Sequence, residues 1–146
     1  MVEANDSIKE NLKTWVTDNK MISDTIDILD AKVVNLEISF VAIADFDRSK
    51  FDILSDATDQ LISFFSRAPD IGEPFFITDV YNQLKKVDGI VDVSDVKISQ
   101  KTGGDYSTIS FNVDANTSAD GRYVEMPKNV IWEIKFPNSD ITGVIK

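Results

Sequence analysis

Acidic side chains are the groups in this sequence that are numerous enough to do chemistry. The chain of 146 residues has 25 Asp and Glu, but no histidine and no cysteine. It therefore lacks an imidazole base, a thiolate nucleophile, and the imidazole and thiolate ligands that zinc prefers. Any catalytic group would therefore have to be a carboxylate, a lysine, a tyrosine or a serine. Paired carboxylates can carry glycoside hydrolysis, and the candidates for this role are Glu37, Asp45, Asp47, Glu73, Glu125 and Glu133.

Asp45 and Asp47 form a D-x-D motif directly after a predicted strand. Carboxylates at such a position often bind Mg²⁺ or Ca²⁺. Acidic residues before a helix are also expected because they interact favourably with its N-terminal dipole, and we favour this interpretation. Since 25 acidic residues form pairs by chance, we predict no catalytic residue, no metal site and no cofactor. A carboxylate-based hydrolase of cell-wall glycan stays the alternative.

Charge and hydropathy restrict the possible partners. The net charge of −10 and the pI near 4.3 argue against nucleic acid, because phosphate binding needs clustered Lys and Arg. No stretch approaches the roughly 20 apolar residues of a membrane span. We therefore expect a soluble protein with no membrane and no nucleic-acid partner. An acidic adaptor that binds a basic partner is a further alternative.

Residues 5–20 have the pattern of a short amphipathic helix, with Ile8, Leu12 and Trp15 on one face and Ser7 as the predicted cap. A helix of this length is marginal alone, so its apolar face must pack on the domain core or on another chain. We predict this helix and an extended lead-in for residues 1–30. One α+β domain is predicted for residues 31–146.

The first strand of this domain is predicted over residues 33–44. Apolar residues alternate along it and place one face toward the core, as the two-residue period of a strand requires. Val41 and Ile43 lie on the other, otherwise polar face. That end of the strand is therefore expected to be covered on both sides, by the domain or by a partner. The core-facing residues are Leu36, Ile38, Phe40 and Ala42.

Two helices are predicted next, with a short connector between them. The first is expected to begin after Ser49 and to run to Pro69, and the second to begin at Thr78 and to end at Gly89. In the connector, Gly72 permits a left-handed backbone and Pro74 restricts Glu73 to extended conformations. The apolar stripes at helical spacing are Leu54, Ala57, Leu61, Phe64, Phe65 and Ala68 in the first helix, and Val80, Leu84 and Val87 in the second.

Three strands are predicted in the last third. Residues 90–98 and 106–114 are expected to form a hairpin around Gly103 and Gly104, and the final strand is expected over 129–136. Ile131 lies on the nominally polar side of that last strand. The fold class is then α+β: an antiparallel or mixed sheet with two helices packed on one face and a short N-terminal helix.

Apolar side chains at positions without an evident core partner are the candidate interaction residues. Exposed apolar side chains of this kind are typical of protein–protein interfaces, where aromatic residues act as anchors. The apolar face of the N-terminal helix is equally able to pack on the core of its own domain. The candidates are Ile8, Leu12, Trp15, Val41, Ile43 and Ile131.

The run from Ile71 to Tyr81, continuing from Val87 to Val93, resembles the baseplate J-like family. In that family a strand and a long helix lead through a Gly-Glu-Pro connector to a second helix, a terminating glycine and a strand hairpin. Here these positions are Gly72, Glu73, Pro74 and Gly89. The resemblance covers about residues 30–113. Residues 21–24 and 28–34 further resemble the C-terminal region of a baseplate wedge subunit of T-even-type phages.

This resemblance implies a virion component without catalytic residues or cofactor. Its copies would form homodimer or ring contacts with one another and with other baseplate wedge proteins, in a ring around the hub of a contractile phage tail. Assembly would take place in the host cytoplasm. Family members are generally much longer, which implies that the sequence is a fragment of a longer protein.

Overall fold

The computed structural model describes residues 6–19 and 31–146, and it has the predicted α+β class. The predicted lead-in over 20–30 lies outside the described residues. The elements, in chain order, are α1 (Asp6–Asn19), β1 (Lys32–Ala44), α2 (Lys50–Phe64), β2 (Phe75–Phe76), α3 (Ile77–Lys85), β3 (Ile90–Lys101), α4 (Val113–Asn116), β4 (Tyr123–Val124), β5 (Val130–Glu133), α5 (Pro137–Asp140) and β6 (Ile141–Ile145).

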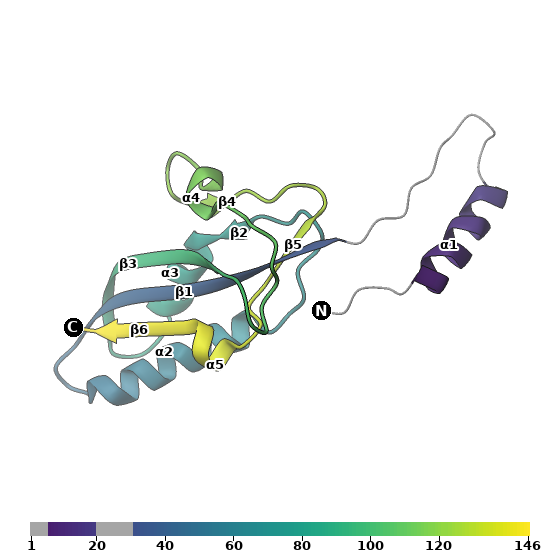
Figure 1. Cartoon of the computed structure of the whole chain (residues 1–146). Helices are drawn as coiled ribbons and strands as arrows, with labels where there is room; N and C mark the ends of the chain where they lie inside the picture. The colour runs from purple at the N-terminus through teal and green to yellow at the C-terminus, as the bar shows by residue number, and fades with distance from the viewer. Residues whose placement is uncertain (1–5, 20–30) are drawn as a thin grey trace.

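A mixed sheet of four strands is built around β1 (Figure 1). On one side β1 pairs with β3 in antiparallel orientation. On the other side it pairs in parallel with β5, over residues 32–35, and then with β6, over residues 38–42. Residues 134–140, which include the short helix α5, separate β5 from β6 on this side of β1. β2 and β4 form a separate antiparallel pair.

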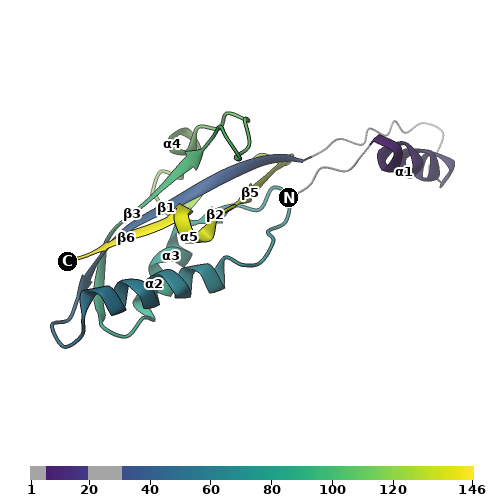
Figure 2. The same cartoon turned by 60° about the horizontal axis from the view of Figure 1, so that its bottom comes forward.

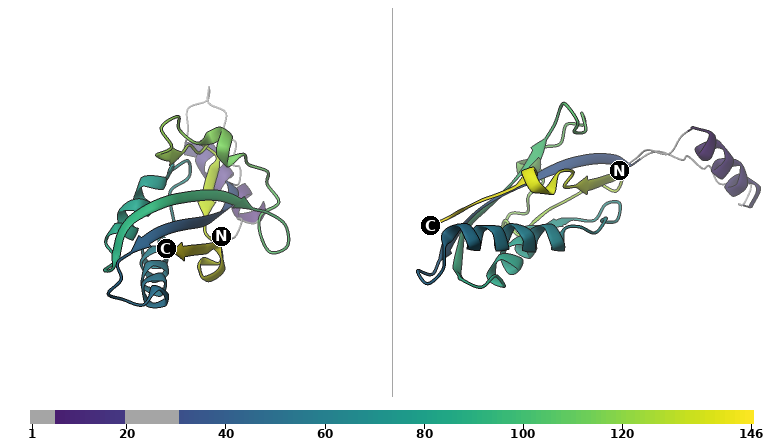
Figure 3. Two further views of the ribbon diagram at one scale, coloured as in Figure 1. Left: turned by 90° about the vertical axis from the view of Figure 1, so that its left-hand side faces the viewer. Right: turned by 90° about the horizontal axis from the view of Figure 1, so that it is seen from below.

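Helices α2 and α3 lie together on one face of the sheet, which we call the inner face (Figures 2 and 3). The alternation of β1 explains this, because every second side chain of the strand joins the same core as the two helices. Helix α2 packs against β6, and α3 packs against β3. The central core residues are Leu36, Ile38, Phe40 and Ala42 of β1, Ile53, Ala57 and Leu61 of α2, and Val80 and Leu84 of α3.

Helix α2 is shorter than its stripe suggested. It ends at Phe64 instead of continuing to Pro69, and Phe65 closes it with a backbone hydrogen bond to Leu61 O. Phe65 then packs with Phe75 and Trp132. This aromatic contact stabilises the chain where it leaves the helix. Ser49 holds the N-cap position, but its hydroxyl makes no capping hydrogen bond.

The connector between α2 and α3 is held by a specific ion pair. Arg67 donates to both carboxylate oxygens of Glu73, at 3.2 and 2.7 Å, and the same carboxylate accepts from Asp70 N at 2.9 Å. The hydrogen bond from Arg67 holds the pKa of Glu73 below its ordinary value, against the opposing effect of partial burial. Gly72 has a φ of 79°, and a Cβ there would lie 3.3 Å from Lys128 Cα, so this position requires glycine.

Helix α3 differs from the prediction at both ends. It begins at Ile77, with Phe76 rather than Thr78 at the N-cap, and it ends at Lys85. Gly89 has the predicted left-handed backbone, with φ of 97°, but it lies at the start of β3, where a Cβ would meet Ile53 Cδ1 at 2.9 Å. Its role is therefore close packing against α2.

The predicted hairpin is wrong. Residues 106–112 form no strand, and in the described part of the chain β3 pairs with β1 alone. Side chains satisfy the backbone of this segment instead: Ser107 N donates to Asn35 Oδ1 at 2.6 Å, and Phe111 N donates to Gln100 Oε1 at 2.9 Å. Gln100 Nε2 also donates to Ile109 O. The segment is thus held across the edge of the sheet by side chains rather than by a strand ladder.

The last predicted strand is also corrected. It ends at Glu133 rather than at Phe136, and Pro137 begins α5. Strand β6 then follows over Ile141–Ile145, where no element was predicted.

Candidate interaction surface

The apolar face of α1 is the largest set of predicted interface residues that the structure leaves exposed. The helix begins at Asp6, so Ser7 lies inside its first turn instead of capping it. Ile8 is 56% exposed, Leu12 49% and Trp15 66%. The hydrophobic core includes no described residue of α1, and the helix lies to one side of the sheet in Figures 1 and 2.

Val41 and Ile43 lie on the outer face of the sheet, opposite the helices. Val41 pairs with Val144 of β6 and with Asp95 of β3. Val41 is half-buried, and Ile43 is 42% exposed. The expected cover on both sides of β1 is therefore incomplete at this end.

Ile131 lies on the outer face of the sheet beside Val33, as the strand alternation predicted, but it is buried, with 9% of its surface exposed. Strand β5 is flanked on both sides. Its backbone pairs with Val33 of β1, and Gly72 N donates to Val130 O at 2.7 Å from the connector. Ile131 therefore offers little exposed surface to a partner.

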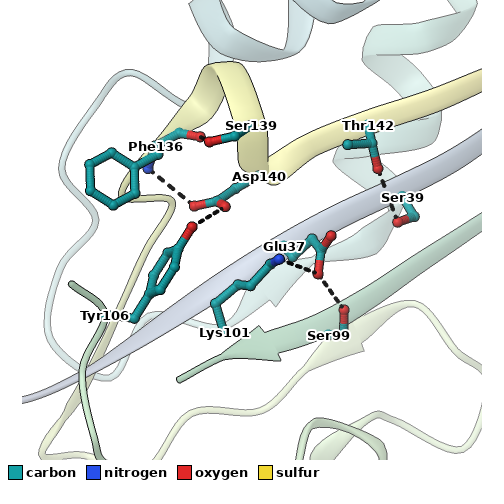
Figure 4. A network of polar contacts seen from close by, with 9 residues as sticks. All are labelled: Glu37, Ser39, Ser99, Lys101, Tyr106, Phe136, Ser139, Asp140 and Thr142. Atoms are coloured by element: carbon teal, nitrogen blue, oxygen red, sulfur yellow. Dashed lines mark hydrogen bonds and ion pairs between the residues drawn. The ribbon is translucent and has the colours of Figure 1, made fainter. Parts of the chain in front are cut away.

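A polar cluster occupies the outer face at the middle of β1 (Figure 4). Glu37 accepts from Ser99 Oγ at 3.3 Å and lies 3.6 Å from Lys101 Nζ. The hydroxyls of Ser39 and Thr142 are 3.3 Å apart. These contacts join β1 to β3 and to β6, and so they connect three strands of the sheet across its outer face.

Asp140 is the most deeply buried carboxylate of this cluster, with 1% of its surface exposed. Its Oδ1 accepts from Tyr106 OH at 2.7 Å, and its Oδ2 accepts from Phe136 N at 3.1 Å. The hydrogen bond to Asp140, together with burial and the nearby negative charges, raises the pKa of Tyr106 to about 12. Tyr106 is therefore protonated at neutral pH and acts as a hydrogen-bond donor that attaches residues 102–112 to α5.

We expect the Asp140→Asn variant to lower the pKa of Tyr106 from about 12 toward the ordinary value near 10. The raised pKa stabilises the folded chain fully below pH 10, and this contribution is lost as the pH rises from 10 to about 12. The ¹³Cζ shift of Tyr106, assigned with a Tyr106→Phe variant, measures the titration. An unchanged Tyr106 midpoint in Asp140→Asn would contradict the assignment.

The candidate carboxylates have structural contacts or lie at the surface. Asp45 accepts a hydrogen bond from Phe46 N at 2.7 Å, Glu73 belongs to the connector ion pair, and Glu133 accepts from Asn35 Nδ2 at 3.2 Å. Asp47 and Glu125 are exposed. Within residues 6–19 and 31–146, no group of three or more acidic side chains is placed to hold a metal ion.

Two shallow clefts border the 106–114 segment. One, of about 430 Å³, lies between Asn35, Tyr106 and Glu133. The other, of about 440 Å³, lies between residues 97–100 of β3 and residues 110–114. Both are wide open to solvent. None of the helices in the described ranges combines the length and apolarity that crossing a bilayer requires.

No model of a known protein family matches this chain, and no curated protein matches it.

Proposed function

We propose that this chain is a structural assembly module whose copies join to one another and to neighbouring subunits. The observation that carries this proposal is the exposed apolar face of α1, where Trp15 is 66% exposed and lies outside the hydrophobic core. Tryptophan is the residue type most often found as an interface anchor, and a short helix gains stability when its apolar face packs on a partner.

The proposed setting is the baseplate of a contractile phage tail, with the module in a ring around the hub. The support is the resemblance over residues 71–93. Along this run the chain has the connector with Gly72 and the Arg67–Glu73 ion pair, then α3, then Gly89 and β3. The family's order of connector, helix, glycine and strand is therefore compatible with this fold, whereas the strand hairpin that follows in the family is absent from the described residues.

Self-association should be weakened about tenfold by Trp15→Ala, which corresponds to about 1.4 kcal/mol lost at an aromatic anchor. Sedimentation velocity over a range of concentrations measures the dissociation constant. Lys13→Ala, an exposed change on the same helix, is the control and should leave it unchanged.

A wild-type chain that stays monomeric at the highest attainable concentration would contradict self-association. The acidic adaptor predicts another result: binding to a basic partner that weakens steeply as salt is raised, because exposed charges are screened.

A further inference from the structure

The sheet has two edges, one formed by β3 and the other by β5 and β6, and they differ in how they are protected against pairing with another chain. β3 carries the charged residues Asp92, Asp95, Lys97 and Lys101, and its register with β1 shifts twice, between Val41 and Ala42 and between Ile43 and Ala44. Bulges and charges are the devices by which edge strands avoid new partners. The free edge of β3 is thus poorly suited to accept a strand.

β6 has none of these devices. Residues Ile141–Ile145 pair with β1 in an unbroken register and include no charged residue and no proline. Within the described residues, β6 pairs with no strand other than β1. Val144 on its outer face is 55% exposed. An edge of this kind is a template for another strand.

Helix α2, which packs against β6, extends this uncharged surface into the helix layer. One side of α2 faces α3, because Gln60 Nε2 donates to Gln83 Oε1 at 2.8 Å. By the helical repeat of 3.6 residues, the opposite side of α2 carries Phe51, Leu54, Thr58 and Ile62. Phe51 is 77% exposed, and the other three are half-buried.

This side of α2 lies beneath the β6 edge. The helix layer follows the order of the strands above it, since α3 packs against β3 and α2 packs against β6. The side of α2 that points away from α3 therefore points outward past β6. Asp56, in contrast, binds Arg48 at 2.7 Å, and Arg48 also donates to Asp88 O in the loop after α3.

We propose that β6 and the Phe51, Leu54, Thr58 and Ile62 side of α2 form a docking surface for a second copy of this chain. The second copy would add its own β6 in antiparallel orientation across a two-fold axis. This inference rests on the proposed assembly function and names a second surface that the function would use besides the apolar face of α1.

The uncharged sequence of β6 can pair with a copy of itself, and this favours a second copy as the occupant. Two chains of net charge −10 repel one another, so they associate best where neither presents a charged residue. An antiparallel pair centred on Gly143 aligns Ile141 with Ile145 and Thr142 with Val144, and it opposes no like charges. A pair formed at the β3 edge would instead place the charged residues Asp92, Asp95, Lys97 and Lys101 of both copies along the contact.

Two valines at opposite edges of the sheet provide a matched test. Val144→Lys adds a charge at the β6 edge, whereas Val91→Lys adds it at the β3 edge, where Val91 is 66% exposed. In sedimentation experiments on the full chain, we expect Val144→Lys to raise the dimer dissociation constant at least about tenfold. Val91→Lys should change it less than about twofold, and circular dichroism checks that both variants fold.

Spin labels provide a second readout that does not disturb the charge. The chain has no cysteine, so Val144→Cys and Val91→Cys each supply a single labelling site. In the dimer, the distance between labels at position 144 should be shorter than that between labels at position 91. The reverse order would overturn the proposal even if a lysine variant failed to fold.

The outcomes separate this inference from the proposed function. If the wild-type chain associates but Val144→Lys and Val91→Lys weaken it equally, the β6 surface is wrong and the assembly function stands. If the wild-type chain never associates, both fail. Since the surface is uncharged and the chains repel, raising salt should strengthen association here. Weakening by salt would instead indicate a charged contact and overturn the β6 surface.

Discussion

Replacing Gly143 by alanine is expected to lower the free energy of unfolding by about 3 kcal/mol, the upper part of the range for overpacking a core. A Cβ at this position would lie closer than 3.0 Å to three atoms of the Phe40 ring. Phe40 pairs directly with Gly143 across β1 and β6 and is 2% exposed. Because the core around the ring is closely packed, either the ring or β6 must shift.

Urea unfolding followed by circular dichroism measures this loss. The control is Gly103→Ala, where a Cβ meets nothing within 4 Å and the only penalty is the positive φ of 81°, which costs about 1 kcal/mol. Replacing Phe40 by leucine removes part of the obstructing ring. We expect the Phe40→Leu, Gly143→Ala double variant to be more stable than the sum of the single effects, by more than about 1 kcal/mol. Additive effects would contradict the direct contact.

The elements that were predicted correctly are those whose apolar spacing has a single interpretation. In β1 the alternation from Leu36 to Ala42 coincides with burial, because the two helices cover one face of the sheet. In α2, Ala57 and Leu61 occupy the core as expected, although Ile53 was missed as a core residue. Local spacing was sufficient there, since each element buries one continuous stripe.

Residues 106–112 show where alternation fails. Ile109, Phe111 and Val113 alternate with polar residues as in a strand, but a strand also needs a neighbour with free backbone groups in register. Here Asn35 and Gln100 satisfy the backbone with side-chain amides. Nothing in the local sequence distinguishes a backbone held by distant side chains from one held by a ladder.

The interaction surface was predictable only in part. The apolar face of α1 follows from its spacing and is exposed in the structure, whereas the use of Trp15 as an interface residue stays a prediction. The β6 edge was missed because Pro137 was taken as the end of the last strand. The β-branched run Ile141, Thr142, Val144, Ile145 was the available signal for another strand. Its partner, its parallel direction and its free edge depend on contacts across about 100 residues of sequence.

Replacing Asn35 by aspartate is expected to destabilise the fold by about 3 kcal/mol at pH 7, as breaking a buried polar network does. Asn35 is 1% exposed, donates from Nδ2 to Glu133 Oε2 at 3.2 Å, and accepts from Ser107 N at 2.6 Å. Aspartate has the same shape and keeps the acceptor for Ser107. It replaces the donor by an oxygen that faces the carboxylate of Glu133, so the folded chain must hold two like charges or a protonated acid.

The pH dependence and a compensating change test this interpretation. Burial beside Glu133 raises the pKa of the introduced acid in the folded state, so the penalty is absent below about pH 4, its unfolded value, and grows as the pH rises. Denaturant unfolding of variant and wild type at pH 4 and pH 7 measures the difference. Adding Glu133→Gln restores a donor opposite the new carboxylate and should recover at least about half of the loss. The Asn35→Asp, Glu133→Gln double variant could also be no more stable than Asn35→Asp alone. The contact between residues 35 and 133 would then not cause the loss of stability, and the contact with Ser107 would be tested next.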